Sequence, residues 1–395
     1  MIYLDNVATS PVDEEVLEAM LPYLKEEYGN PSSKYYCKAV NSKNAVEQAR
    51  ENVSRLINAK SEEIVFTSGA TESTNFIIKG YMDYSKYYGN GKNHIITSKA
   101  EHKATLNVCK YLNGEIYSNN DATISLLGNY NKIDRGYNVT FLDVQSNGTV
   151  SPNSIKDSII DNTAMVSIMY VNNEIGSIND IKTISKICND KNIAFHTDVT
   201  QAIGKLPIDV KEISCDFMSF SAHKIYGPKG IGCAFLKSDS YGIPPITSLL
   251  HGGEQENGLR GSTLSVHDIV GFGKACEIAL RDIEKNNKKI SQLDEYFLTK
   301  IQSISDIYLV NNSNERLKGI ISILVDRTNF NNERFIKKIS PEIAISTGSA
   351  CSIGEPSHVI SAIGKSKDVS KVLRVSLSKY STKNDIDEFI KYLTK

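Results

Sequence analysis

The sequence predicts an α/β protein whose large, mostly parallel sheet is covered by helices, together with a smaller α+β C-terminal domain. Between residues 64 and 198 short apolar segments alternate with helical stretches, which is typical of a parallel sheet covered on both faces. From about His267 this alternation stops, and one long helical stretch opens a region of mixed elements. Polar side chains follow the apolar segments, and ligands of such sheets bind beyond the carboxyl ends of the strands.

The first part of the chain supplies the elements of the large sheet. Strands are expected over 64–66, 94–97, 139–142, 164–169 and 193–198, and in the run that begins at Phe217. Helices are expected through Lys79, from near Glu101 past Cys109, and over 181–189. The stretch 111–137 is polar, rich in Asn and Gly and weakly periodic, so we expect a surface insertion there.

The last part of the chain predicts the second domain. A helical stretch over 267–301 precedes a strand over 320–325, a helix over 333–338, a strand over 372–377 and a last helix capped near Asn384. We therefore expect residues 14–262 to form the large domain. Residues 1–13 and 263–395 are expected to form the small one.

The composition excludes several classes of partner. The 395 residues are 40% apolar and 23% charged with a formal net charge of −1, so nothing predicts binding to nucleic acid or to an anionic membrane. No apolar run approaches the roughly 18 residues that span a bilayer, and an acid stands where a signal peptide has its apolar core. The seven cysteines include no Cys-x-x-Cys pair. We expect a cytoplasmic protein with free thiols.

Lys224 carries the first indication of chemistry. It ends the run 217–224, in which an apolar strand gives way to small, polar and basic residues. Such a lysine is costly to leave unpaired and can bond covalently to an aldehyde cofactor. Asp198 ends another apolar strand, where it can hold the protonated nitrogen of a pyridine ring. The pair predicts pyridoxal phosphate, although Lys224 alone also fits a surface lysine near a turn.

Other strand ends carry groups suited to the same cofactor. Ser68, Gly69, Ala70 and Thr71 form a strand-to-helix turn that can bind phosphate, or simply cap the helix. Ser221 and His223 would donate to the same phosphate.

Three more polar residues are expected around the cofactor ring. His102 can stack on a pyridine ring and act as acid or base, or it only caps a helix. Asn173 and Gln201 can donate to the phenolic oxygen, although asparagine after a strand usually makes a turn.

The C-terminal region adds a nucleophile and a substrate anchor. Cys351 lies in a loop of Gly, Ser and Ala, where a thiol is accessible and able to attack. Cys109, Cys188 and Cys276 on helices, like Cys215 and Cys233 beside strands, are expected to be buried and inert. Arg374 lies within an apolar strand, so its guanidinium needs a carboxylate partner: the substrate or an internal acid.

Taken together, these motifs resemble the cysteine desulfurases, the class V branch of the fold-type I pyridoxal-phosphate enzymes, in particular those of iron–sulfur assembly. The resemblance covers nearly the whole chain. The matching segments are 3–9, 29–33, 67–72, 101–103, 171–176, 198–201, 221–224, 251–253, 260–263, 349–351 and Arg374.

The resemblance implies a role for each matching residue. Lys224 bonds to the cofactor aldehyde, Asp198 holds the ring nitrogen, His102 stacks on the ring, and Asn173 and Gln201 contact its oxygen. The phosphate is held by Ala70, Thr71, Ser221 and His223, and by Thr263 of a second subunit, which implies a homodimer. Arg374 and Asn173 bind the substrate.

The resemblance also implies the reaction. Lys224 removes the α-proton of L-cysteine, and the Cys351 thiolate takes the sulfur as a persulfide, leaving L-alanine. The persulfide passes to an acceptor protein, an iron–sulfur scaffold or a thiolation enzyme. No metal site is implied beyond a transient contact of Cys351 with an iron–sulfur cluster.

Several positions depart from the family pattern and leave the acceptor open. Tyr35 and Lys38 stand where the family has histidine and glycine, Val7 replaces an alanine, and the segment 351–356 is about two residues short. A selenocysteine lyase or a class V aminotransferase is the alternative activity. A scaffold of the same fold without turnover is the alternative of another class.

Overall fold

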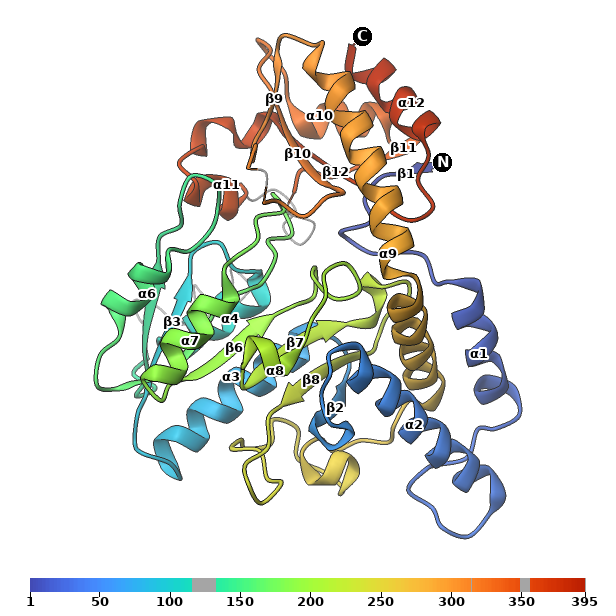
Figure 1. The fold of residues 1–395 in the computed structure, drawn as a ribbon, viewed down its shortest axis with the longest axis vertical. Coiled ribbons are helices and arrows are strands. Elements are labelled where there is room, and N and C mark those ends of the chain that lie inside the picture. Colours follow the sequence, from blue (N-terminus) through green and yellow to red (C-terminus); the bar gives the residue numbers. More distant parts are fainter. Residues whose placement is uncertain (116–132, 314, 349–355, 395) are drawn as a thin grey trace, which may run out of the picture.

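The structure is a computed structural model that describes residues 1–115, 133–313, 315–348 and 356–394 (Figure 1). Its largest sheet has seven strands in the order β2-β8-β7-β6-β5-β3-β4. The strands are β2 (Ile64–Thr67), β3 (His94–Ser98), β4 (Asn138–Leu142), β5 (Thr163–Ser167), β6 (Ala194–Asp198), β7 (Phe217–Ser221) and β8 (Gly232–Leu236). All neighbours from β4 to β7 pair parallel, whereas β8 runs antiparallel to β7 and β2.

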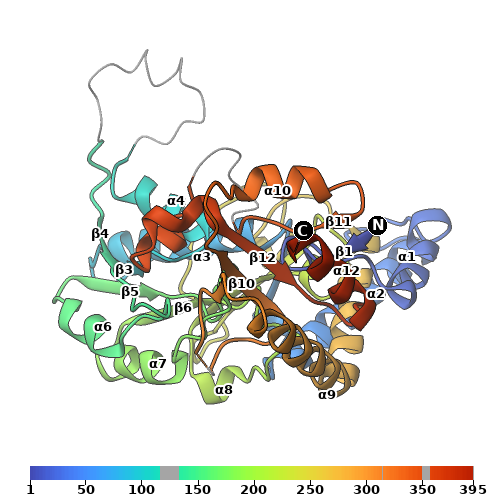
Figure 2. The same ribbon diagram turned by 90° about the horizontal axis from the view of Figure 1, so that it is seen from above.

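Alternating side chains of the sheet enter two different hydrophobic cores. Ile95 and Met165 pack with the helices α3 (Ala70–Tyr87) and α4 (Lys103–Leu112), whereas their neighbours Ile96 and Val166 enter the core on the opposite face. That core includes residues of α2 (Cys37–Leu56), α6 (Pro152–Ser158), α7 (Ile181–Asp190) and α8 (Val210–Ile213). Helices therefore cover both faces of the sheet, as the sequence predicts (Figure 2).

A second group of elements surrounds a separate core. A three-stranded antiparallel sheet is formed by β9 (Ile307–Leu309), β10 (Ile320–Val325) and β12 (Val372–Ser376), and β1 (Ile2–Tyr3) pairs with β11 (Ile343–Ala344). The helices of this region are α10 (Asn332–Ile339), α11 (His358–Ala362) and α12 (Lys383–Thr394). Short 3₁₀ turns complete the fold: η1 (Ser61–Glu63), η2 (Ala222–Lys224), η3 (Gln255–Gly258) and η4 (Ser366–Lys371).

The long helix α9 (Val266–Gln302) belongs to both cores. Its first turns place Val266, Phe272 and Cys276 in the core beneath the large sheet, next to α1 (Glu14–Lys25) and α2. Its later turns place Leu293 and Phe297 in the core of the C-terminal elements. Figure 1 shows α9 running from the small sheet down along α1.

Most elements expected from the sequence are present within a few residues, but others were not predicted: β1, α1, α2, α6, α8, β8, β9, β11 and α11. Of the expected insertion 111–137, residues 116–132 lie outside the described residues. Tyr137, at its end, is buried and donates a hydrogen bond to Asp83 Oδ1 at 2.5 Å. Among the helices that the structure describes, none has the length and apolar character to cross a membrane.

Candidate active site

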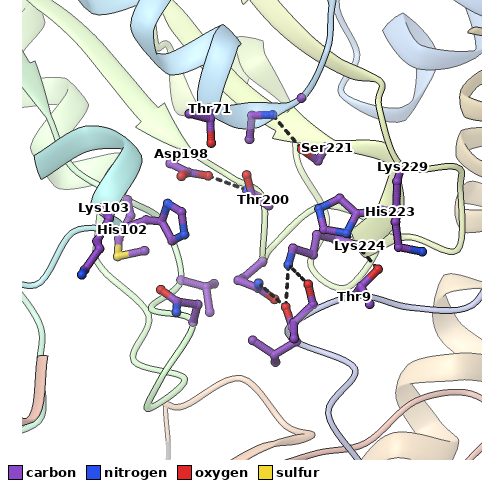
Figure 3. A pocket seen from close by; sticks show the side chains of 18 of the residues that line it. Thr9, Thr71, His102, Lys103, Asp198, Thr200, Ser221, His223, Lys224 and Lys229 are labelled. Carbon is purple, nitrogen blue, oxygen red and sulfur yellow. Dashed lines mark hydrogen bonds between the residues drawn. The ribbon is translucent and has the colours of Figure 1, made fainter. Parts of the chain in front are cut away.

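A cavity of about 540 Å³ opens where the parallel strands of the large sheet end (Figure 3). Arg374 and His358, from the C-terminal elements, also line it. The structure brings ten of the predicted site residues together in its wall: Ala70, Thr71, His102, Asn173, Asp198, Gln201, Ser221, His223, Lys224 and Arg374. Thr263 is exposed and does not line this cavity. Cys351 lies outside the described residues.

Lys224 points into the cavity from η2, the tight turn that directly follows β7. Its Nζ donates to the carbonyl oxygens of Val7 and Ala8, each at 2.6 Å. These carbonyls belong to the N-terminal segment 5–10, which crosses the cavity between β1 and α1. The N-terminal segment is held in turn by hydrogen bonds from Val7 N to Ser376 Oγ and from Ser10 Oγ to the His223 carbonyl.

Asp198 and His102 lie together in the cavity wall. Asp198 is the last residue of β6, is 5% exposed, and accepts a hydrogen bond from Thr200 N at 2.9 Å. His102 Nδ1 accepts from Ala104 N at 3.2 Å, so the neutral ring carries its proton on Nε2. Burial lowers the pKa of His102, although the nearby Asp198 carboxylate acts in the opposite direction. His102 therefore caps α4 and lines the cavity at once.

The cavity wall also contains several hydrogen-bond donors. Ser221 Oγ accepts from Ala70 N at 2.7 Å, which leaves its own O–H to donate. The imidazole of His223 shares a hydrogen bond with Thr9 Oγ1, and burial, with Lys224 as the next contribution, lowers the pKa of His223 to about 3. Thr71 points into the same space from the first turn of α3 (Figure 3). A helix N-terminus with these donors is suited to an anion.

A glycine permits this arrangement of α3 and β8. A Cβ on Gly232 would lie 2.6 Å from Gly69 Cα and 2.7 Å from the Phe220 carbonyl oxygen. No side chain fits at that position, and its absence allows the turn before α3 to approach the sheet.

Arg374 is fully buried in β12 and already has an internal carboxylate. Its Nη2 donates to Asp5 Oδ1 at 2.8 Å, and its Nη1 donates to the carbonyls of Gly348 and Asn173. Its Nε is buried and has no hydrogen-bond partner among the described residues. The guanidinium therefore keeps a donor for a further carboxylate while the internal ion pair fixes its position.

Asn173 and its neighbour Asn172 have different positions. Asn172 is buried and donates to the Ala100 carbonyl at 2.9 Å, so it fixes the loop after β5. Asn173 lines the cavity. Gln201 also lines it, and its Nε2 donates to the Val7 carbonyl at 3.3 Å.

The sequence did not single out two further residues of the wall, Glu174 and His358. Glu174 is buried and accepts from Ser357 Oγ at 2.5 Å, and burial raises the pKa of its carboxyl. His358 Nε2 donates to the Glu101 carbonyl at 2.9 Å. Glu174 lies inside the 171–176 motif and could have been noticed there. The sequence signal for His358 is weak: it directly follows Ser357, which is the N-cap of α11.

The cysteines expected to be structural are buried. They are Cys109, Cys188, Cys215, Cys233 and Cys276, and burial raises the pKa of every one of these thiols, that of Cys188 to about 12. Cys37 is exposed. No cluster of His, Cys, Asp and Glu within the described ranges is arranged to hold a metal ion.

The chain is similar to known proteins over almost its whole length. The Aminotransferase class-V family model matches residues 2–389. The cysteine desulfurase IscS of Rickettsia prowazekii (strain Madrid E) is 41% identical over 390 residues, which cover 98% of this chain and 88% of the relative. That of Rickettsia bellii (strain OSU 85-389) is 40% identical over 396 residues, 99% of this chain and 90% of the relative.

Solved structures agree with these relatives. A NifS-like protein has a TM-score of 0.85 and 32% identity, with 99% of this chain and 97% of the other covered. A structure described as SspA in complex with cysteine has a TM-score of 0.79 and 33% identity, with 97% of this chain and 100% of the other covered.

Proposed function

The chain belongs to the class-V aminotransferase family and, within it, to the cysteine desulfurases, and from this premise we propose that it takes sulfur from L-cysteine onto Cys351. L-Cysteine and the Cys351 thiol give L-alanine and a Cys351 persulfide. The carbon–sulfur bond of the substrate breaks, a sulfur–sulfur bond forms, and one hydrogen moves from the thiols to carbon. Like other members of its family, the enzyme depends on pyridoxal phosphate.

The cavity fits this cofactor because its wall holds both kinds of group that the cofactor needs. It contains a buried carboxylate, Asp198, and the donors Thr71, Ser221 and His223, with the N-terminus of α3 close by. The carboxylate would hold a pyridine nitrogen that carries a proton, and the donors would hold a phosphate. The hydroxyl of Thr200 is buried without a hydrogen-bond partner among the described residues, which leaves a further donor in the wall.

Lys224 is proposed to move the α-proton of the substrate. When bound, pyridoxal phosphate supplies an electron-withdrawing ring that stabilises the negative charge left at the α-carbon. The Nζ of Lys224 accepts that proton, and the carbonyls of Val7 and Ala8 hold the protonated amine by charge-assisted hydrogen bonds. His102, whose Nε2 carries a proton in the neutral ring, is the proposed donor that completes alanine.

Arg374 and Asn173 are proposed to orient the substrate. The unpaired Nε of Arg374 offers a hydrogen bond to the α-carboxylate, and the ion pair with Asp5 keeps the guanidinium in place. Since Asp5 already neutralises part of the charge of Arg374, the substrate carboxylate has to share it.

Cys351 is proposed as the nucleophile from the sequence, and its described neighbours support the proposal. The Gly348 carbonyl accepts from Arg374, and Ser357 donates to Glu174. Both chain positions that flank 349–355 are thus tied to residues of the cavity wall.

The partner assignments are also proposals. We propose a cytoplasmic homodimer in which Thr263 reaches the phosphate of the other subunit, supported by its exposed position away from its own cavity. The sulfur acceptor is proposed to be an iron–sulfur scaffold or a thiolation enzyme, with Cys351 in transient contact with a cluster.

Replacing the thiol tests the proposed reaction. In Cys351→Ser, formation of alanine from L-cysteine should fall by at least about 100-fold, because the sulfur no longer has a nucleophile. The visible absorbance of the bound cofactor should remain. In the wild type, mass spectrometry after L-cysteine should find one added sulfur atom on the peptide that contains Cys351.

Cys37→Ser is the matched control, since Cys37 is exposed and does not line the cavity. It should keep the wild-type rate. Alanine formation at the native rate by Cys351→Ser would assign the nucleophile elsewhere, whereas a 2-oxo acid formed in place of alanine would favour the class V aminotransferase alternative. L-Selenocysteine as a competing substrate distinguishes the selenocysteine lyase alternative.

A further inference from the structure

A second cavity, of about 40 Å³, lies behind Lys224 and separates it from the C-terminal elements. Four lysines line it: Lys205 from the turn after β6, Lys224 from η2, Lys318 before β10 and Lys379 after β12. Among the described residues that line it, none is an aspartate or a glutamate. The charges of Lys205 and Lys224 act on each other, whereas Lys379 is paired with Asp13.

Lys205 connects this second cavity to the first one. Its Nζ donates to Gln201 Oε1 at 3.1 Å, and Gln201 Nε2 donates to the same Val7 carbonyl that accepts from Lys224. The backbone of Lys205 is fixed as well, because Asn287 of α9 donates to its carbonyl at 2.7 Å.

This contact decides how the Gln201 amide is turned. An ammonium or amine group of lysine offers hydrogen atoms, so it selects the oxygen of the amide and directs the NH₂ group away from itself. The NH₂ of Gln201 is then held on the side of the main cavity, where a phenolic oxygen needs a donor.

The charge of Lys205 is sensitive to its surroundings. Burial, and then the positive charge of Lys224, lowers the pKa of Lys205 to about 7. The other titratable groups that face it are His223 of η2, Tyr226, Lys318 and Lys379. Burial raises the pKa of Tyr226, and Lys379 is paired with Asp13. Repulsion is mutual, so a proton on Lys205 also weakens the hold of Lys224 on its own proton.

We propose that Lys205 is a positioning residue of this active site, which orients the Gln201 amide and places a positive charge behind Lys224. The inference rests on the proposed function, in which Lys224 bonds to the cofactor. In this role Lys205 touches neither substrate nor cofactor and acts through its two neighbours.

The pH titration of the visible absorbance of the resting holoenzyme tests this role. Lys205→Met removes the charge and should raise the titration midpoint by about half a unit or more. Lys205→Arg makes the charge permanent and should lower it. In Lys205→Met, kcat/KM for L-cysteine should also fall about tenfold, because Gln201 loses the partner that fixes its amide.

Lys318→Met is the matched control, because Lys318 lines the same cavity from the other side and makes no hydrogen bond to Gln201 in the part of the chain described. Its midpoint should shift much less than that of Lys205→Met, since only Lys205 is bonded to Gln201 and interacts with the charge of Lys224. Wild-type midpoints in both Lys205 variants, or equal shifts in all three variants, overturn the inference even if the rate falls. If Lys205→Met does not fold, the downward shift in Lys205→Arg decides alone. The two Lys205 variants could shift the titration midpoint in opposite directions although the wild-type enzyme forms no alanine. That result would support the role of Lys205 and refute the proposed removal of sulfur.

Discussion

His196 shows how a single side chain ties stability to pH beneath the site. It lies two residues before Asp198 on the same face of β6, fully buried between the hydroxyls of Ser167 and Ser219. Burial lowers the pKa of His196 to about 3. The unfolded chain binds a proton at this histidine below about pH 6.5, whereas the folded chain does not, so its contribution to stability is lost as the pH falls.

The contribution can be isolated with His196→Gln, whose amide also reaches two hydroxyls. Between pH 7 and pH 5 the wild type should lose about 2 kcal/mol of unfolding free energy relative to the variant. Urea denaturation at both pH values, at one protein concentration, measures the difference. Burial raises the pKa of Glu101 to about 8, which acts in the opposite direction in both proteins and cancels. A pH-independent difference would show that His196 binds its proton equally well in the folded and the unfolded chain.

Single residues also show what the sequence could not predict. Lys224, Asp198 and Arg374 were recognised because a charged side chain at the end of, or within, an apolar strand demands an explanation. The partners of Lys224 could not be recognised in the sequence, because they are the backbone carbonyls of Val7 and Ala8 and every residue has a carbonyl. Asp5 as the carboxylate of Arg374 was equally hidden, since 369 positions separate the two.

At the scale of elements, β8 determines how closely α3 approaches the cofactor site. Gly232→Ala should push the Gly69 turn outward, because the added Cβ meets backbone atoms on two sides. The affinity for pyridoxal phosphate, measured from the absorbance of the reconstituted enzyme, should fall about tenfold or more. Gly242→Ala is the control: Gly242, unlike Gly232, has a positive φ, but a Cβ at this position enters open space and meets no backbone atom. An unchanged affinity in Gly232→Ala would mean that the turn does not hold the phosphate.

The elements that the sequence predicted and missed differ in physical character. Strands β3, β5 and β6 are buried on both faces. In the sequence each of them is therefore a short run of mostly apolar residues that ends in a polar residue. Strand β8 is equally apolar but antiparallel, and no local pattern reports the direction of a strand. Helices α1 and α2 were missed. Their buried hydrophobic residues pack against α9, which lies more than 200 residues later in the chain, so the neighbouring sequence does not indicate which of their residues are buried.

For the whole molecule, we propose the division into residues 14–262 and residues 1–13 with 263–395. The separate cores support it, and so does the contribution of β1 to the C-terminal elements. Helix α9 would then connect the two domains without an interruption, since its first turns pack on the large sheet and its later turns on the small one.

The homodimer proposal predicts a particular pattern of complementation. When Thr263→Ala and Lys224→Ala subunits are combined, the mixed dimer should regain one intact site, with Lys224 from one chain and Thr263 from the other. The measurement is cofactor retention and alanine formation in purified mixed dimers, compared with each parent. If Thr263 acts within its own chain, no mixed dimer has both residues in one site, and nothing is regained.

The N-terminal segment has a practical consequence for anyone who prepares this enzyme. Within six residues it supplies the salt-bridge partner of Arg374, two acceptors for Lys224 and the hydroxyls that contact His223. Clipping by a protease, or an affinity tag that disturbs the first strand, would disable several parts of the site while leaving most of the fold in place. Intact-mass verification of the amino terminus should therefore accompany every rate measurement, and purification tags are better attached at the carboxyl terminus.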